Sequence, residues 1–120
     1  MNNNEFRVIV AGGRDFQNSD LLKHKLDVLL SSKENVVIVS GCAKGADMLG
    51  EKYARQNNLV ISFYPALWGQ FGKQAGFGRN LEMAKNADAC VCFWDGSSVG
   101  TKHMIDTAKS MNIKLRVIGY

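Results

Sequence analysis

Three apolar runs in this chain each end in a loop of glycines and small polar residues, and a helical pattern follows each loop. The runs are residues 8–11, 36–39 and 89–94, and the loops are residues 12–15, 40–47 and 95–101. In a parallel sheet such loops open on the carboxyl edge, so they can surround one ligand. Glycine lets the backbone approach a phosphate closely, and the first N–H groups of the next helix suit an anion. The pattern therefore predicts a phosphate- or nucleotide-binding domain.

Strands and helices alternate along the whole chain. We expect strands at residues 6–11, 36–39, 59–64, 89–94 and 115–118. Helical spacing predicts helices after an N-cap at Ser19 and over residues 46–56, 79–86 and 101–111. Near-continuous apolar strands joined by helices imply right-handed crossovers and a sheet covered on both faces. The expected fold is a three-layer α/β/α domain whose five-stranded, mainly parallel sheet has the order 3-2-1-4-5, with the ligand between strands 1 and 4.

Length and composition limit the classes of protein to which the chain can belong. The 120 residues fit a single domain over residues 1–120, and 46% hydrophobic with 22% charged residues is typical of a soluble globular protein. No apolar run approaches membrane-spanning length, and residues 1–5 lack the features of a signal peptide. We therefore expect a cytoplasmic protein without a membrane partner. The net charge of +4 weakly favours anionic ligands, but the lysines are scattered, so no nucleic-acid partner is predicted.

The three cysteines do not predict a metal site, because their spacing does not resemble that of zinc ligands. Cys90 and Cys92 lie two apart on an expected strand and are interpreted as buried apolar residues. Cys42 lies in a glycine loop before a helix. The helix N-terminus would lower its pKa and make it reactive, and the alternative is a spacer. No cofactor is predicted to be required.

The first two loops carry charged side chains beside their glycines. Arg14 either pairs with a phosphate or forms a surface pair with Asp15. Lys44 precedes the run of residues 45–47, which is not the order of a P-loop, so ATP hydrolysis is not predicted. Asp47 either caps its own helix or touches the ligand.

The third loop leads directly into a helix and carries three hydroxyl groups, so we expect the phosphate cradle there. A polar turn without a ligand is the alternative. The candidate ligand-binding residues of the chain are Gly12, Gly13, Arg14, Ser40, Gly41, Lys44, Arg79, Asn80, Gly96, Ser97, Ser98, Gly100 and Thr101.

Arg79 is predicted to begin a helix, where the helix dipole disfavours a cation. This placement suggests a ligand contact, with a salt bridge to Glu82 as the alternative. The segment before it, residues 68–77, has no helical or strand period. Glycines at positions 69, 72 and 76, with Gly78 directly after, lie among Trp68, Phe71 and Phe77. We interpret it as a loop that covers the ligand, packs on a second subunit or completes the core. A homo-oligomer is expected, because a chain this short has little other surface with which to close a site.

Four stretches of the chain, taken in order, resemble the YspA-type (cpYpsA-related) family of the SLOG superfamily. They are residues 8–16, 40–47, 78–80 with Met83, and 96–101, and together they span nearly the whole chain. The resemblance implies a Rossmann-like fold that binds nucleotides or nucleotide-derived ligands. Some relatives bind ADP-ribose-type signals. The expected function is therefore the sensing or sequestration of such a phosphorylated ligand.

A catalytic branch of this superfamily, the Lonely Guy phosphoribohydrolases, cleaves the N-glycosidic bond of nucleoside monophosphates with an arginine and a glutamate. Arg79 matches that arginine, whereas Met104 stands at the glutamate position and cannot ionise. Residues 94–98 also replace the proline–glycine start of the branch's motif. The resemblance thus implies binding rather than hydrolysis.

The alternative is a nucleotide hydrolase in which Arg79 stabilises the phosphate and an aspartate acts as acid or base. Asp95 is the first candidate for this catalytic role, and Asp15 and Asp106 are the others.

Overall fold

Five parallel strands form the central sheet of this protein. The computed structural model describes residues 4–67, 72 and 74–120. The strands are β1 (Phe6–Gly12), β2 (Val36–Ser40), β3 (Val60–Phe63), β4 (Ala89–Trp94) and β5 (Lys114–Gly119). The helices are α1 (Ser19–Leu29), α2 (Ala46–Gln56), α4 (Gln74–Lys85) and α5 (Val99–Ser110). The sheet order is β3-β2-β1-β4-β5 with every neighbouring pair parallel, which confirms the predicted topology.

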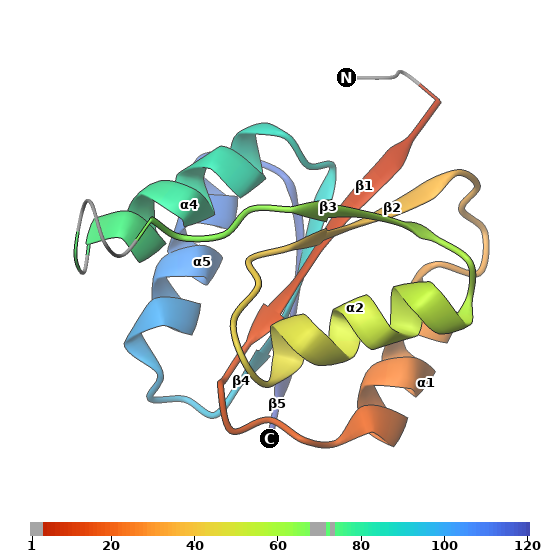
Figure 1. The fold of residues 1–120 in the computed structure, drawn as a ribbon, viewed down its shortest axis with the longest axis horizontal. Coiled ribbons are helices and arrows are strands. Elements are labelled where there is room, and N and C mark those ends of the chain that lie inside the picture. Colours follow the sequence, from red (N-terminus) through yellow and green to blue (C-terminus); the bar gives the residue numbers. More distant parts are fainter. Residues whose placement is uncertain (1–3, 68–71, 73) are drawn as a thin grey trace.

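Alternate side chains of the central strands point to opposite faces of the sheet. Val8 and Val10 of β1 belong to an apolar core shared with α1 and α2, whereas Ile9 and Ala11 belong to a second core shared with α4 and α5. Figure 1 shows the two helix pairs on opposite sides of the sheet. The protein is therefore the three-layer α/β/α domain that the sequence predicts.

The strand order reverses between β1 and β4, which pair in register from Val8 with Ala89 to Gly12 with Phe93. On one side of this boundary the chain winds outward through β2 to β3, and on the other it winds through β4 to β5. Loops that leave such a boundary diverge to opposite faces of the sheet and leave a crevice between them. The carboxyl ends of β1 and β4 therefore position the site.

Two helix starts differ from the sequence prediction. Asn18, not Ser19, caps α1, and its side-chain oxygen accepts a hydrogen bond from the Leu21 amide at 3.0 Å. Helix α4 begins at Gln74, so Arg79 lies inside the helix and the prediction that it begins the helix is wrong. The glycines of this helix obscured its first turn, because glycine disfavours helix interiors.

The predicted aromatic loop overlaps α4 at its end. Residues 74–77 are helical, so interpreting them as loop is wrong, and Phe77 is an exposed residue of α4. Trp68 and Phe71 lie outside the described residues, so their role as flap, interface or core stays a prediction.

The longest helices of the described residues, α4 and α5, have 12 residues each. Crossing a bilayer takes roughly 20 apolar residues. The described part of the chain therefore holds no helix that is long and apolar enough to span a membrane.

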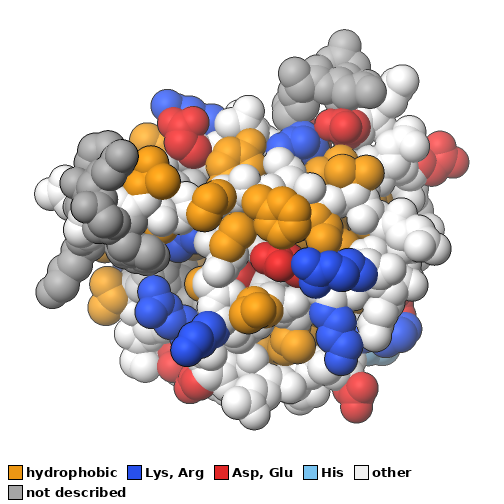
Figure 2. Space-filling view, in the orientation of Figure 1, with side chains coloured by type: hydrophobic (Ala, Val, Ile, Leu, Met, Phe, Trp, Pro, Cys, Tyr) orange, Lys and Arg blue, Asp and Glu red, His pale blue; other side chains and the backbone are white. Residues whose placement is uncertain are grey.

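Strand β3 forms one edge of the sheet and carries exposed apolar side chains. Val60 and Phe63 are both exposed on it. Figure 2 shows apolar side chains gathered over the part of the surface where Figure 1 places β3 and α2. The opposite edge, β5, exposes Val117 but also carries the charged Lys114 and Arg116. Charged side chains protect sheet edges against association, so β3 is the less protected edge, and the homo-oligomer stays a prediction.

Candidate functional site

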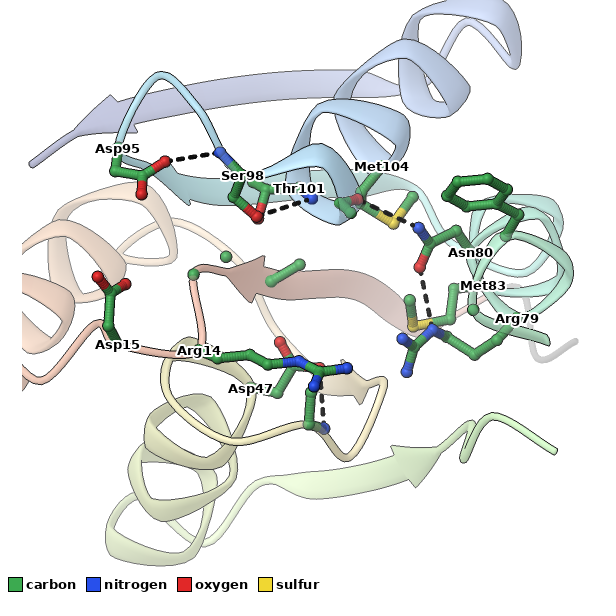
Figure 3. Close-up of a pocket in the computed structure, with 17 residues that line it drawn as sticks. Arg14, Asp15, Asp47, Arg79, Asn80, Met83, Asp95, Ser98, Thr101 and Met104 are labelled. Carbon is green, nitrogen blue, oxygen red and sulfur yellow. Dashed lines mark hydrogen bonds between the residues drawn. The ribbon is translucent and has the colours of Figure 1, made fainter. Parts of the chain in front are cut away.

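The carboxyl ends of β1, β2 and β4 surround a cavity of about 430 Å³. Its walls come from the loops after these three strands and from helices α4 and α5. Figure 3 shows side chains from these elements facing one shared space. The cavity thus lies at the topological switch point, where the sequence predicts the ligand.

The loops after β1 and β2 are packed back to back. The Gly13 carbonyl accepts hydrogen bonds from the Phe16 and Ala46 amides, both at 3.2 Å. Gly45 has a φ of 79°, and a Cβ there would collide with the same carbonyl. A residue with a side chain would therefore separate the two loops and displace the start of α2 from the cavity.

Asp15 of the first loop also lines the cavity. Its Oδ1 accepts a hydrogen bond from the Tyr120 hydroxyl at 2.6 Å. The Tyr120 ring packs edge-on against Phe16, with ring centroids 4.8 Å apart. This contact fastens the first loop to the end of β5.

Asp47 is a nearly buried carboxylate that lines the cavity, with 5% of its surface exposed. Its Oδ2 accepts a hydrogen bond from the Ala43 amide at 3.2 Å. Burial raises the pKa of Asp47 to about 6, against the opposing effects of this hydrogen bond and of Arg79. This hydrogen bond goes to the loop before α2, and Gly45 is the N-cap of that helix with no side-chain cap hydrogen bond. Asp47 therefore orders its loop and lines the cavity, and its contact with a ligand stays a prediction.

Arg79 reaches across from α4 to the loop after β2. Its guanidinium donates hydrogen bonds to the Gly41 carbonyl and, at 3.0 Å, to Asn80 Oδ1. Burial lowers the pKa of Arg79, and the nearby Asp47 carboxylate opposes that effect. The predicted salt bridge to Glu82 is absent from the described ion pairs, in which Glu82 pairs with Lys85 at 3.6 Å. Arg79 thus presents a cation to the cavity beside a buried carboxylate.

The loop after β4 is ordered by its own carboxylate. Asp95 Oδ1 accepts hydrogen bonds from the Ser97 and Ser98 amides at 2.9 and 2.8 Å, and these bonds lower the pKa of Asp95. Ser98 caps α5 by accepting from the Thr101 amide at 3.4 Å. The first turn of α5 contains no acidic residue, but the Asp95 carboxylate accepts from its N-cap Ser98 and offsets part of the positive dipole end. Only part of the predicted phosphate cradle is therefore open to a ligand, namely the amides of the first helical turn.

An aromatic and amide wall closes the α4 side of the cavity. Phe77 lines it and stacks on the His103 ring, with centroids 4.1 Å apart. The Asn80 amide is paired with His103 Nδ1 at 3.1 Å and with the Gly100 carbonyl at 3.5 Å. These contacts hold α4 and α5 together at the mouth of the site.

The cavity gathers most of the predicted ligand-binding residues. Those that line it are Gly12, Gly13, Arg14, Arg79, Asn80, Ser98, Gly100 and Thr101, and the catalytic candidate Asp95 lines it as well. Those that fall outside its lining are Ser40, Gly41, Lys44, Gly96 and Ser97. Ser40 is fully buried, where its hydroxyl donates to Glu51 Oε2 at 2.6 Å and accepts from the Cys42 amide at 3.1 Å. Its hydroxyl therefore orders the loop from behind.

Several lining residues are not among the candidate ligand-binding residues, although the sequence suggested other or alternative roles for some of them. Asp15, Asp47 and Phe77 contribute charge and aromatic surface, and the buried side chains of Met83 and Met104 form apolar wall. Met104, which stands where the hydrolase branch has glutamate, thus faces the cavity as an apolar group. Asp106 is exposed, pairs with Lys102 at 2.8 Å and lies outside the lining residues. A signal for Asp47 existed in the sequence, since it stands in the first turn of the helix that follows a glycine loop.

The cysteines differ from one another in environment. Cys90 and Cys92 are buried in the core beneath α4 and α5, as predicted. Burial raises the pKa of Cys42, and the negative charge of Glu51 adds to this effect. The interpretation of Cys42 as a thiol activated by the helix N-terminus is therefore wrong. No group of three or more His, Cys, Asp or Glu residues within the described residues is arranged to hold a metal ion.

Similarity to known proteins extends over most of the chain. The model of the YspA, cpYpsA-related SLOG family matches residues 6–71. The Gene 61 protein of Mycobacterium phage D29 is 36% identical over 114 residues, a match that covers 89% of this chain and 91% of that protein. The X-ray structure of DNA processing protein A (DprA) from Streptococcus pneumoniae shares the fold with a TM-score of 0.69 at 19% identity. That match covers 94% of this chain and 50% of the DprA chain, so this chain spans half the length of that structural neighbour.

Proposed function

Because the chain belongs to the YspA, cpYpsA-related SLOG family, we propose that it binds a nucleotide or nucleotide-derived phosphorylated ligand in the cavity at the switch point. One observation carries the proposal: Arg14, Arg79 and the first turn of α5 converge on a single cavity. Guanidinium groups and helix N-termini are the protein groups that best suit phosphate. An ADP-ribose-type signal is one ligand of this class.

The charges of the residues that line the cavity limit how many phosphates the ligand can carry. Asp15, Asp47 and Asp95 line the same cavity as Arg14 and Arg79, so carboxylates outnumber guanidinium groups. A triphosphate would meet repulsion there, whereas a ligand with one or two phosphates and several hydrogen-bond donors matches both kinds of group. A volume of about 430 Å³ lies within the range for sites that enclose small organic ligands.

The protein's role is then to sense or sequester this ligand without a required cofactor. A titration panel tests the proposal: AMP, ADP, ADP-ribose, NAD, cyclic nucleotides and a single-stranded oligodeoxynucleotide, followed by calorimetry and thermal shift. The oligonucleotide is included because the structural neighbour is a DNA processing protein. Binding of a mononucleotide or dinucleotide is expected. If no compound of the panel binds, the proposal is overturned.

A pair of variants on α4 makes the test specific. Arg79→Met removes the lining guanidinium and is expected to weaken binding by roughly tenfold or more, because charge-assisted hydrogen bonds to phosphate are lost. Lys85→Met removes one cation from the exposed last turn of the same helix and is expected to leave affinity unchanged. Equal losses in both variants would point to the net charge of the protein and not to the cavity.

One observation keeps hydrolysis of the bound nucleotide as a second candidate. Asp47, not Asp15, Asp95 or Asp106, is the carboxylate beside Arg79, and its pKa of about 6 suits an acid–base group near neutral pH. In that reaction water would replace the base on the anomeric carbon, and the products would be free base and ribose phosphate. Chromatography of the nucleotide after long incubation with the protein tests this reaction. Recovery of the intact nucleotide, without free base or ribose phosphate, excludes hydrolysis.

A further inference from the structure

The inner wall of the cavity presents an acceptor to the ligand. Asp47 is 5% exposed yet lines the cavity, and Figure 3 shows it on the side opposite Ser98 and Thr101. Its hydrogen bond with the Ala43 amide uses one of about four acceptor positions of a carboxylate. The other acceptor positions face Arg79, Arg14 and the cavity, so a ligand can compete for them.

The groups around Asp47 determine its charge. Arg79 from α4 and Arg14 from the first loop favour the ionised form, whereas Glu51 on its own helix and burial disfavour it. Well above neutral pH the ionised form prevails, and an ionised carboxylate only accepts hydrogen bonds. A phosphate without a proton cannot donate one, so the ligand group that binds Asp47 itself is a hydroxyl or an amine.

The position of the anion site decides between these two donors. The first turn of α5 lies across the cavity from Asp47, and the amides of a helix N-terminus suit a phosphate. In a nucleotide the ribose hydroxyls are the donors nearest to the phosphate, and the amine of the base lies beyond the sugar. Phe77 lines the cavity on the α4 side and offers the aromatic surface that suits the base.

We propose that Asp47 accepts a hydrogen bond from a ribose hydroxyl, so that this cavity selects ribonucleotides over deoxyribonucleotides. The inference rests on the proposed nucleotide-binding function and names the ligand class within it. A ligand without the hydroxyl leaves a buried carboxylate without its donor, which is a large penalty for so small a change in structure.

The test compares matched nucleotides on the wild-type protein at about pH 8, where Asp47 is ionised. Calorimetry measures the affinities of the four ribonucleoside monophosphates and of their 2′-deoxy and 3′-deoxy counterparts. We expect at least one of the two deoxy series to bind roughly 10- to 100-fold more weakly than the ribose series. This measurement needs no variant, so it does not depend on the folding of a mutant.

Variants then assign the preference to one side chain. Asp47→Asn is expected to bring the ribose-to-deoxy affinity ratio to within about threefold, because an amide oxygen is a weaker acceptor than a carboxylate. Asp106→Asn makes the same change in charge on the exposed face of α5 and is expected to keep the wild-type ratio. The ratio is the readout, since removal of a negative charge from the protein changes the absolute affinity for an anionic ligand in either variant.

The outcomes separate this inference from the function on which it rests. Equal wild-type affinities for ribose and both deoxy series overturn the selection by Asp47 and leave nucleotide binding standing. A ribose preference that survives Asp47→Asn overturns it as well. So does a much higher affinity for adenosine monophosphate than for inosine monophosphate that is lost in Asp47→Asn, because Asp47 would then bind the amine of the base. Failure of every nucleotide to bind overturns the proposed function and the selection together.

Discussion

Asp47 and Arg79, which come from helices on opposite faces of the sheet, meet at Gly41. The Arg79 guanidinium donates a hydrogen bond to the Gly41 carbonyl, and a Cβ on Gly41 would lie 2.9 Å from Asp47 Oδ2. The missing side chain at Gly41 is therefore what lets the carboxylate and the guanidinium lie side by side. Gly41 acts on the cavity through these two neighbours although it does not line the cavity itself.

The first prediction concerns this close approach. In Gly41→Ala the new methyl group collides with the Arg79 guanidinium and crowds Asp47, so both side chains have to move. We expect nucleotide binding to weaken, because both charged ends are displaced. The free energy of unfolding should fall by about 1 kcal/mol at most, because the displaced atoms are the ends of side chains and not backbone. Calorimetry and urea denaturation measure the two effects.

Gly78→Ala is the matched control for this change. A Cβ at Gly78 meets no atom within 4 Å, and the residue lies inside α4. Replacing glycine by alanine inside a helix stabilises the fold by roughly 0.5–1 kcal/mol. If both variants bind nucleotide like the wild type, the approach of Asp47 to Arg79 has no part in the site.

The second prediction concerns the pH dependence of stability. The pKa of Asp47 is about 6 in the folded protein against an ordinary value of 3.8, so between these values the folded state binds more protons than the unfolded state. Stability due to this group therefore falls as pH rises from about 4 to about 6, and the cost persists above that range. We expect Asp47→Asn to be more stable than the wild type by up to about 3 kcal/mol at pH 8.

Urea denaturation of both proteins at several pH values measures this effect. The gain of Asp47→Asn should shrink to nearly nothing at about pH 4, because the wild-type carboxyl is then protonated in the folded state. Other carboxyl groups titrate alike in both proteins, so their contributions cancel in the difference. A gain that is the same at all pH values would show that the burial of this charge is not its cause.

The sequence was sufficient to predict the sheet, because each of its central strands is an apolar run that ends at a glycine-bearing loop. The bounds of α2 and of β4 were also predictable, since both elements are bordered by strong local signals. Local signals failed at α4, where Gly76 and Gly78 weaken the helical pattern. There Ala75 and Gly76 are buried against the rest of the molecule, and packing prevails over intrinsic propensity.

The candidate site was predictable in outline but not in its charges. Glycines and hydroxyls are recognisable in the loops themselves, whereas the role of Asp47 depends on Arg79, which is distant in sequence and adjacent in space. In the same way the partner of Asp15 is Tyr120, which no spacing in the sequence indicates. For Ser40 the sequence suggested a ligand contact that the packing does not provide. Its position after a strand pointed to the ligand, whereas its hydroxyl faces inward and donates to Glu51.

The third prediction concerns thiol reactivity. Burial and the charge of Glu51 raise the pKa of Cys42, so the thiolate is scarce near neutral pH. We expect iodoacetamide to modify the folded protein more slowly than it modifies a free thiol at pH 7, with the rate rising as pH rises above 9. Mass spectrometry of Cys42→Ser provides the control, because Cys90 and Cys92 are buried and should react only on unfolding. Rapid alkylation of Cys42 at neutral pH would contradict this environment.

The last prediction concerns the contact between Tyr120 and Asp15. Tyr120→Phe removes the hydroxyl that donates to Asp15 Oδ1 at 2.6 Å and leaves the ring against Phe16. The loss of one hydrogen bond should lower the free energy of unfolding by about 1 kcal/mol at most. Because Asp15 lines the cavity, its released carboxylate also adds an unshielded negative charge near the phosphate, so we expect weaker nucleotide binding.

Tyr53→Phe is the matched control, since it removes a hydroxyl bonded to Asp27 at 2.8 Å between α1 and α2, away from the cavity. Calorimetry on both variants should show a loss of affinity in Tyr120→Phe alone, and a loss shared by Tyr53→Phe would mean that general stability, and not the position of Asp15, governs binding.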